Sequence, residues 1–278
     1  MTVRVDSHVH LWNRATDPQD WIDPQSMAPI DRDFGQADLR SMLDETHVDR
    51  AVVVHASNSV EESVRLSRLD PEVVAGLVAW VDLTGDVVAQ LDLIRATATV
   101  PVVGTRHLVQ IDPDPEWLLR EDVGRGLSAL ADEGMRFDLV VRDWQLPQAR
   151  TVASRHSDLI FVLDHLGGPP APGEDLSEWE SGLRNLASRP NVVAKLSGLI
   201  SGLAPGSWQV DDLRRVVEIA LTAFGAERLL YGSDWPLAEL GGGAAGWGAA
   251  AEHLLAELTD EERRRVFGLN AVAVYSLD

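Results

Sequence analysis

Cysteine is absent from the 278-residue sequence. The chain can therefore form no disulfide, and it offers neither a thiolate nucleophile nor a thiolate ligand for zinc. Histidine, aspartate and glutamate remain as the side chains that can bind a metal. Any metal site in this chain is expected to have nitrogen and oxygen ligands.

Basic residues are few, since 24 Lys and Arg stand against 44 Asp and Glu and the formal net charge is −20. A surface that binds nucleic acid needs clustered Lys and Arg, so we expect no nucleic-acid partner. Acidic side chains on outer helices account for such a charge, which by itself implies no cationic substrate.

Long apolar runs are missing as well, because no stretch approaches the ~20 residues needed to cross a bilayer. The N-terminus also lacks the basic and then apolar pattern of a signal peptide, and Asp6 interrupts it early. We therefore expect a cytoplasmic protein with no membrane partner. Apolar residues still make up 45% of the chain, which is enough for a sizeable core.

Short β-branched runs alternate with longer amphipathic stretches along the chain. Eight candidate strands follow from this pattern, at residues 3–6, 51–55, 74–81, 102–107, 137–141, 160–164, 192–196 and 229–232. Continuous apolar strands such as 51–54 suit a parallel sheet that is covered on both faces. Eight strands with room for a helix between neighbours predict a (β/α)8 TIM barrel, a single α/β domain over residues 1–278.

Helices are expected between the strands, at residues 37–46, 60–69, 86–98, 116–131, 148–156, 176–188, 211–224, 246–258 and 259–268. Three irregular stretches follow predicted strands instead, at 13–34, 167–175 and 237–246. All three lie on the carboxyl side of strands, where barrel enzymes keep their active sites.

Two histidines, His8 and His10, follow the first predicted strand. In an extended chain residues i and i+2 point to the same face, so both imidazoles project the same way. They can share one metal ion or one substrate. Asp6 is expected to act behind them, as a hydrogen-bond partner that fixes the tautomer of an imidazole.

Five of the eight histidines fall at or just after predicted strand ends, namely His8, His10, His55, His107 and His165. Asp234 closes the eighth strand, which lies beside the first in a closed barrel, so Asp234 should face His8 and His10. His8, His10, His165 and Asp234 then make a mononuclear site of the kind that zinc uses for hydrolysis. The alternative for Asp234 is a helix N-cap or turn former before Trp-Pro.

Cationic and aromatic side chains gather at the same predicted rim. Arg106, Arg142 and Lys195 can each hold a carboxylate or stabilise an oxyanion. The alternative is that each pairs with a structural aspartate, and Lys195 requires a partner because a charge in so apolar a strand costs several kcal/mol if unpaired. Trp12 and Trp235 can wall a pocket for a compact ring or simply pack under the loops.

Five motifs in register carry a resemblance: Asp6-Ser7-His8-Val9-His10, Gly104-Thr105-Arg106-His107, Leu163-Asp164-His165-Leu166-Gly167-Gly168, Lys195-Leu196-Ser197-Gly198 and Tyr231-Gly232-Ser233-Asp234-Trp235-Pro236. Together they resemble the amidohydrolase superfamily, in its amidohydrolase family 2 branch of sugar and dicarboxylate lactonases. The resemblance implies a distorted barrel that hydrolyses small cyclic esters, such as L-fucono-, L-rhamnono- or galactono-lactone. It also implies that Asp234 is the general base and that Arg106 and His107 line the substrate pocket.

The chain departs from the binuclear members of that superfamily, because its fourth strand offers no bridging lysine or glutamate. We therefore expect one divalent metal, zinc before others, with a metal-free enzyme as the alternative. The predicted roles are catalysis for Asp234, His165 and His107; substrate contact for Arg106, Lys195, Arg142, Trp12 and Trp235; and metal ligation for His8, His10, His165 and Asp234.

The leading hypothesis is hydrolysis of a five- or six-membered lactone, in which Asp234 deprotonates a water that attacks the ring carbonyl. The same constellation can support a non-oxidative decarboxylase acting on a carboxylate substrate. A third alternative is a catalytically silent barrel that serves as a binding protein. No pattern decides the oligomeric state, and a homodimer stays open.

Overall fold

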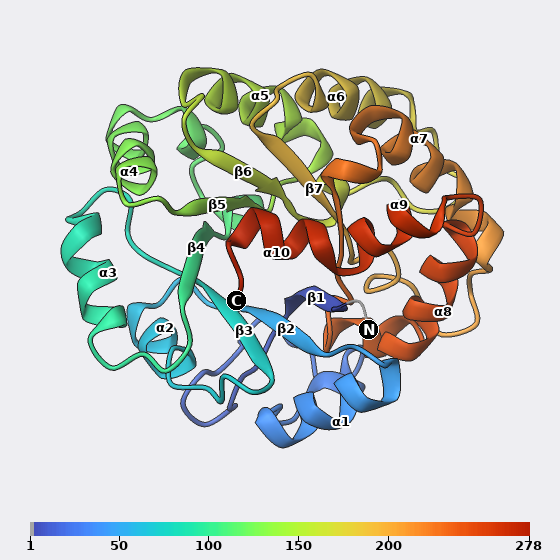
Figure 1. The fold of residues 1–278 in the computed structure, drawn as a ribbon, viewed down its shortest axis with the longest axis horizontal. Coiled ribbons are helices and arrows are strands. Elements are labelled where there is room, and N and C mark those ends of the chain that lie inside the picture. Colours follow the sequence, from blue (N-terminus) through green and yellow to red (C-terminus); the bar gives the residue numbers. More distant parts are fainter. Residues whose placement is uncertain (1–2) are drawn as a thin grey trace.

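The computed structural model describes residues 3–278, and eight parallel strands form its centre (Figure 1). Each strand pairs with the next along the chain. The strands are β1 (Val5–Val9), β2 (Arg50–Val54), β3 (Val74–Ala79), β4 (Val102–His107), β5 (Arg136–Leu139), β6 (Ile160–Leu163), β7 (Val192–Leu196) and β8 (Leu229–Tyr231). The predicted (β/α)8 barrel is confirmed.

The seam between β8 and β1 is the least regular part of the barrel. β1 and β8 form no regular ladder; an isolated bridge instead joins Val9 of β1 to Trp235, four residues after β8. Two backbone hydrogen bonds support it, from His10 N to Trp235 O at 2.7 Å and from Asp234 N to His8 O at 2.9 Å. The distortion that the resemblance implied therefore lies at the point where the first and last motifs meet.

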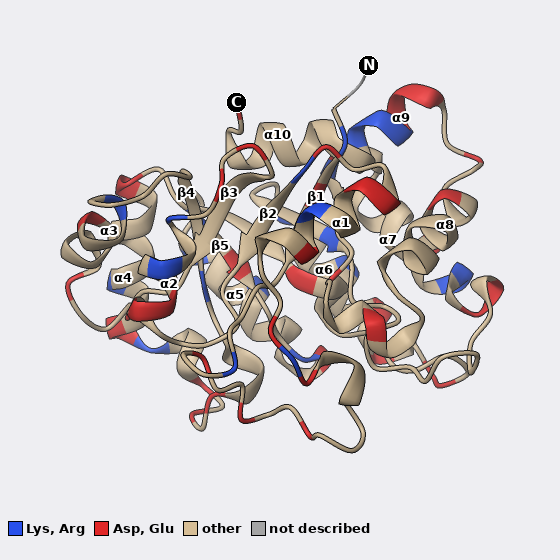
Figure 2. Ribbon diagram, turned by 90° about the horizontal axis from the view of Figure 1, so that it is seen from below, with Lys and Arg blue, Asp and Glu red and all other residues tan. Residues whose placement is uncertain are grey.

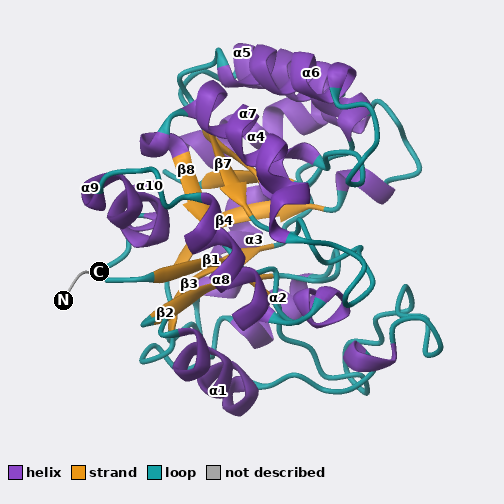
Figure 3. Cartoon of the chain, turned by 90° about the vertical axis from the view of Figure 1, so that its right-hand side faces the viewer, coloured by secondary structure: helices purple, strands orange, loops and turns teal. Residues whose placement is uncertain are grey.

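One helix follows each strand, and together the helices surround the barrel (Figure 3). They are α1 (Gln36–Thr46), α2 (Val60–Leu66), α3 (Val87–Arg95), α4 (Glu121–Asp132), α5 (Leu146–Arg155), α6 (Ser177–Ala187), α7 (Arg214–Phe224) and α8 (Ala244–Leu254). Within residues 3–278 no helix is long and apolar enough to cross a membrane.

The apolar core has two parts. The larger one lies between the strands and the helices, where residues such as Leu77, Leu139 and Trp247 are buried. The smaller one joins inward-facing strand residues such as Val54 and Val162. Successive residues of a strand point to opposite faces, so alternate residues pack inside the barrel and against the helices outside it.

The C-terminal residues close one end of the barrel. The predicted helix 259–268 is in fact α9 (Asp260–Arg264) followed by a π-helical stretch (Arg265–Leu269), and a further helix that was not predicted, α10 (Asn270–Tyr275), continues from it. Figure 1 shows α10 lying across the barrel. Tyr275 and Leu277 pack with the inward-facing strand residues and fill this end.

The first strand is longer than the predicted 3–6 and runs through His8. Its polar residues are tolerated in a buried strand because each finds a partner; the Ser7 hydroxyl, for example, donates to Tyr231 O at 2.7 Å. The loop after β1 is irregular as expected, apart from one short turn at Ala28–Ile30.

Candidate active site

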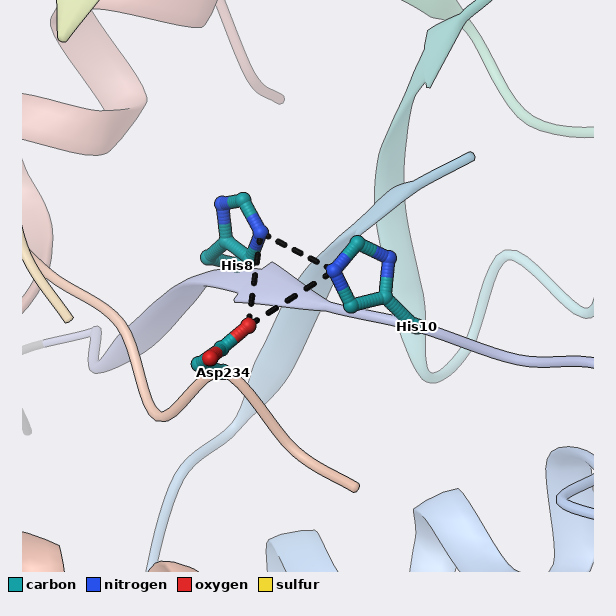
Figure 4. Close-up of side chains that lie close together, drawn as sticks. All are labelled: His8, His10 and Asp234. Atoms are coloured by element: carbon teal, nitrogen blue, oxygen red, sulfur yellow. Dashed lines mark hydrogen bonds and ion pairs between the residues drawn. The ribbon is translucent and has the colours of Figure 1, made fainter. Parts of the chain in front are cut away.

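Four side chains predicted to meet do meet, at the carboxyl end of the barrel. Asp234 Oδ1 lies 3.7 Å from His8 Nε2, 3.6 Å from His10 Nε2 and 3.8 Å from His165 Nε2. The Nε2 atoms of His8 and His10 are 3.1 Å apart (Figure 4). Three imidazoles from two strand ends therefore converge on one carboxylate oxygen.

Backbone geometry helps to aim two of these side chains. His165 has φ 52° and Asp234 has φ 61°, so both occupy the left-handed region that residues other than glycine rarely adopt. Such conformations cost of order 1–3 kcal/mol and are found where the surrounding structure holds them for function. His165 lies two residues after β6 and Asp234 three residues after β8.

The outer nitrogen of each imidazole has a partner behind it. His10 Nδ1 lies 2.7 Å from Val54 O, and His165 Nδ1 lies 2.9 Å from the Ser197 hydroxyl. A carbonyl accepts only, so Nδ1 of His10 carries its proton and Nε2 presents a lone pair to the site. This tautomer is the one that a metal ligand needs.

His8 has a charged pair behind it rather than a neutral one. Its Nδ1 lies 3.2 Å from Asp164 Oδ1 and 3.1 Å from Lys195 Nζ. Lys195 Nζ can only donate, so a hydrogen bond from it to Nδ1 and a proton on Nδ1 toward Asp164 exclude each other. In either case Nε2 faces His10 and Asp234. A carboxylate behind a ligating histidine is a common arrangement in zinc sites, where it orients the ring and raises its basicity.

The prediction that Asp6 would fix an imidazole is wrong. Asp6 Oδ1 accepts from the backbone N–H groups of His8 at 3.1 Å and of Ser233 at 2.9 Å. Asp6 thus joins the two sides of the β1–β8 seam, and Asp164 takes the place expected for it. Asp164 was visible in the sequence as an acid at the end of an apolar strand, directly before His165.

Three of the converging side chains, His8, His10 and Asp234, fit a metal ion as one set. Asp234 Oδ1 is buried and has no hydrogen-bond donor among the described residues, whereas Oδ2 accepts from the Ser201 hydroxyl at 2.6 Å. The ligand atoms of His8, His10 and Asp234 all lie within 4.8 Å of one another, and their separations of 3.1–3.7 Å match the edges of a tetrahedron, about 3.4 Å, around a metal with bonds of about 2.1 Å. Asp234 therefore neither caps a helix nor merely forms a turn through its side chain.

The charge states suit the same role. Burial lowers the pKa of His8 well below its ordinary value and also lowers the pKa of His10, so both rings are neutral at pH 7. Burial alone would raise the pKa of Asp234, but the facing imidazoles of His165, His10 and His8 outweigh it and hold the pKa below its usual range. The site thus presents a carboxylate beside the neutral rings of His8 and His10.

Beneath the site lies a buried network of ion pairs that the sequence did not reveal. Lys195 Nζ pairs with Asp138 Oδ2 and, at 3.0 Å, with Asp164 Oδ1. Arg106 Nη1 lies 3.0 Å from Asp164 Oδ2. The Tyr275 hydroxyl lies 2.9 Å from both oxygens of Asp138. The partner that a charge at Lys195 required is therefore a pair of aspartates.

A cavity of about 770 Å³ opens above the four side chains. Its floor holds His10, Arg106, His165 and Asp234. Its walls come from the loops that follow β1, β4, β5, β6, β7 and β8, and they are largely apolar: Met27, Ile111, Leu199, Leu203 and Leu237. Arg142 is exposed at this cavity and has no ion pair within residues 3–278.

Five predicted site residues lie outside the set that lines this cavity, and the buried His8 is one of them. His107 is held by Asp112 at 2.8 Å and stacks on Trp117 with ring centroids 3.8 Å apart. Lys195 is fully buried beneath the floor. Trp12 and Trp235 pack against Phe34 under the first loop. Contact with substrate stays a prediction for Arg106 and Arg142, which do line the cavity.

Comparison with known proteins identifies the family. A family model described as amidohydrolase matches residues 5–277. The chain belongs to the amidohydrolase family. This agrees with the five motifs, all of which lie at strand ends around the cavity.

Two curated relatives and one crystal structure are similar over essentially their full lengths. The chain is 33% identical to the L-fucono-1,5-lactonase of Burkholderia ambifaria, over 100% of this chain and 97% of that protein. It is 30% identical to the L-fucono-1,5-lactonase of Burkholderia multivorans, over 99% and 96%. An amidohydrolase from Burkholderia multivorans with bound zinc has a TM-score of 0.91 at 29% identity, over 99% and 100%.

Proposed function

We propose that this amidohydrolase opens the ring of a small lactone by attack of an activated water. The observation that carries the proposal is the position of Asp234 Oδ1, which is buried, faces three imidazoles and lies at the floor of the cavity. Similarity to two L-fucono-1,5-lactonases supports the substrate class.

The residues of the floor divide the chemistry among them. Asp234 takes a proton from water, whose oxygen attacks the ring carbonyl carbon. Arg106 Nη1, 3.4 Å from His8 Nε2, is placed to stabilise the negative charge that develops on the carbonyl oxygen. As the bond from the carbonyl carbon to the ring oxygen breaks, Asp234 returns the proton to that oxygen and a hydroxy acid leaves.

His8, His10, His165 and Asp234 would hold the zinc ion. When bound, zinc supplies Lewis-acid activation of the carbonyl and of water. The bound zinc of the structural neighbour from Burkholderia multivorans supports this choice of metal.

The cavity favours a lactone that carries hydroxyl groups and also has an apolar face. Gln110 Oε1 lines the cavity, is buried and has no donor among the described residues, so it can accept from a substrate hydroxyl. Ile111, Leu203 and Leu237 offer apolar walls instead. A 6-deoxy aldonolactone, whose terminal carbon is a methyl group, matches this division better than a fully hydroxylated one.

A pH-indicator screen of aldonolactones and dicarboxylate lactones tests the proposal, with enzyme-free controls for spontaneous hydrolysis. We expect acid release from L-fucono-1,5-lactone, loss of the activity after chelation and its return with zinc. Absence of acid release from every lactone would contradict the proposal. Activity that persists after proven metal removal would select the metal-free alternative.

The decarboxylase alternative makes a different product. Carbon dioxide release from aromatic carboxylates, without acid release from lactones, would select it. We further propose that the protein acts in the cytoplasm, without a nucleic-acid partner, and the homodimer remains a proposal that light scattering can decide.

A further inference from the structure

A chain of buried polar contacts runs from the C-terminal helix to the site. It begins at the Tyr275 hydroxyl of α10, which donates to Asp138 on β5. Asp138 pairs with Lys195 on β7. Lys195 Nζ then lies 3.0 Å from Asp164 Oδ1 and 3.1 Å from His8 Nδ1.

Every member of this chain is buried. Tyr275, Asp138, Lys195, Asp164 and His8 each have an exposed fraction of 0–1%. In such an interior a charged group has no water to replace a missing partner, so each contact constrains the next.

The two aspartates that pair with Lys195 differ in how many other partners they have. Asp164 also has Arg106 Nη1 at 3.0 Å and His8 Nδ1 at 3.2 Å. For Asp138, the Tyr275 hydroxyl is the one partner besides Lys195 among residues 3–278. Loss of that hydroxyl leaves Asp138 to draw Lys195 toward itself, away from Asp164 and His8.

We propose that Tyr275 is a positioning residue: through Asp138 and Lys195 it holds the His8 imidazole with Nδ1 against Asp164 and Nε2 toward Asp234, and so sets the affinity of the site for its metal. This inference rests on the metal site of the proposed function. A residue at the end of the barrel opposite the cavity would then influence metal binding at the site.

The aromatic ring of Tyr275 has a separate role, since it packs with Ala271, Leu277 and inward-facing strand residues. Tyr275→Phe keeps that ring and removes only the hydroxyl. Tyr231, the chain's other tyrosine, is equally buried on β8 and takes no part in this chain of contacts. Tyr231→Phe is therefore a matched control for the loss of a buried phenolic oxygen.

The test measures the zinc dissociation constant of the full-length protein by competition with a chromophoric chelator. Loss of a direct partner of a metal ligand weakens binding about 10–100-fold, so we expect about 3–10-fold for Tyr275→Phe, which acts through two intermediates. Tyr231→Phe should stay within about twofold of the parent protein.

A double-mutant cycle separates positioning from a general loss of stability. Lys195→Met removes the contact that links Asp138 to His8. In that background Tyr275→Phe should therefore change the zinc affinity no further. If Lys195→Met does not fold, the Asp138→Asn background serves the same purpose. Equal effects of Tyr275→Phe in the parent and in the cut background would overturn the proposal, and so would an unchanged affinity in the parent.

The ¹⁵N chemical shifts of the His8 ring provide a reading that needs neither metal nor turnover. We expect them to move in Tyr275→Phe and to stay in place in Tyr231→Phe. A parent protein that binds no zinc would refute the metal site, and the shifts would still decide the positioning role. Unchanged His8 shifts in Tyr275→Phe would overturn it.

Discussion

His10 shows how a single backbone contact decides the chemistry of a side chain. Because Val54 O occupies the outer side of the ring, the proton lies on Nδ1 and the other nitrogen faces the site. His8 Nδ1 instead faces Asp164 Oδ1 and Lys195 Nζ, and burial lowers the pKa of both rings, which are neutral at pH 7. For His10, this one contact leaves Nε2 free for the proposed metal.

Zinc affinity should therefore depend little on mildly acidic pH. A ring whose pKa is lowered holds no proton that the metal must displace. Between pH 6.5 and 5.5 we expect the affinity to fall by no more than about tenfold, whereas three imidazoles with the ordinary pKa of about 6.5 would lower it about 10²-fold. Competition titrations at the two pH values measure this, and a hundredfold loss would show that the buried rings are protonated.

Gly198 is a second position where one atom decides the site. Its φ is +68°, and a Cβ there would lie 2.5 Å from His165 Nδ1. Gly198→Ala should displace the His165 ring and lower both kcat and zinc affinity by about 10-fold or more, in the range seen when groups behind a ligand are lost.

Gly206 provides the control, since its φ is +76° and a Cβ would meet nothing within 4 Å. Both substitutions carry the cost of a left-handed alanine, about 1 kcal/mol or more. Only Gly198→Ala should change kinetics. Equal kinetics in the two variants would mean that the position of His165 does not matter for turnover.

At the scale of elements, the seam between β1 and β8 joins the two ends of the chain at the site. The one bridge across the seam joins Val9 to Trp235, beyond the end of β8, so hydrogen bonds to the side chain of Asp6 replace part of a regular ladder. Burial raises the pKa of Asp6 to about 6, against the opposing hydrogen bonds from Ser233 and His8. One oxygen, Asp6 Oδ1, accepts both of the N–H groups that hold the seam.

Asp6→Ala should lower the free energy of unfolding by about 2–4 kcal/mol, because it leaves the buried N–H groups of His8 and Ser233 without an acceptor. Asp6→Asn keeps the oxygen and should cost less than about 1 kcal/mol. Urea unfolding of both variants measures the difference. Similar losses in the two variants would show that the carboxylate charge matters after all.

At the scale of the whole molecule, the two ends of the barrel have different tasks. One end is filled by α10, and the other carries the cavity. Figure 2 shows most acidic and basic residues on the outer helices and loops, in line with the expected source of the negative charge. The charged residues inside the barrel are the exception, and they lie beneath the site.

The order of the strands, the barrel and the meeting of His8, His10, His165 and Asp234 could be predicted, because period and strand-end position are local properties of a sequence. The partners of Lys195 could not, since they depend on which side chains β5, β6 and β7 turn inward. Asp138 and Asp164 lay within predicted strands 137–141 and 160–164, where an acid in an apolar run was the available signal.

Other misses arise from long-range packing. Tyr275 joins the network through a C-terminal helix that the pattern did not show. His107 carried the same strand-end signature as the other histidines, but Asp112 and Trp117 from the following loop hold it. The geometry of such loops depends on contacts between distant segments rather than on local pattern.

The most direct measurement is the turnover of a lactone by Asp234→Asn, with Asp212→Asn as the control. Asp212 is an exposed aspartate that lines the same cavity. Loss of the general base should lower kcat about 10²–10⁴-fold without a comparable change in melting temperature, while Asp212→Asn stays near the parent. Near-normal turnover by folded Asp234→Asn would contradict the central claim that this carboxylate activates the water.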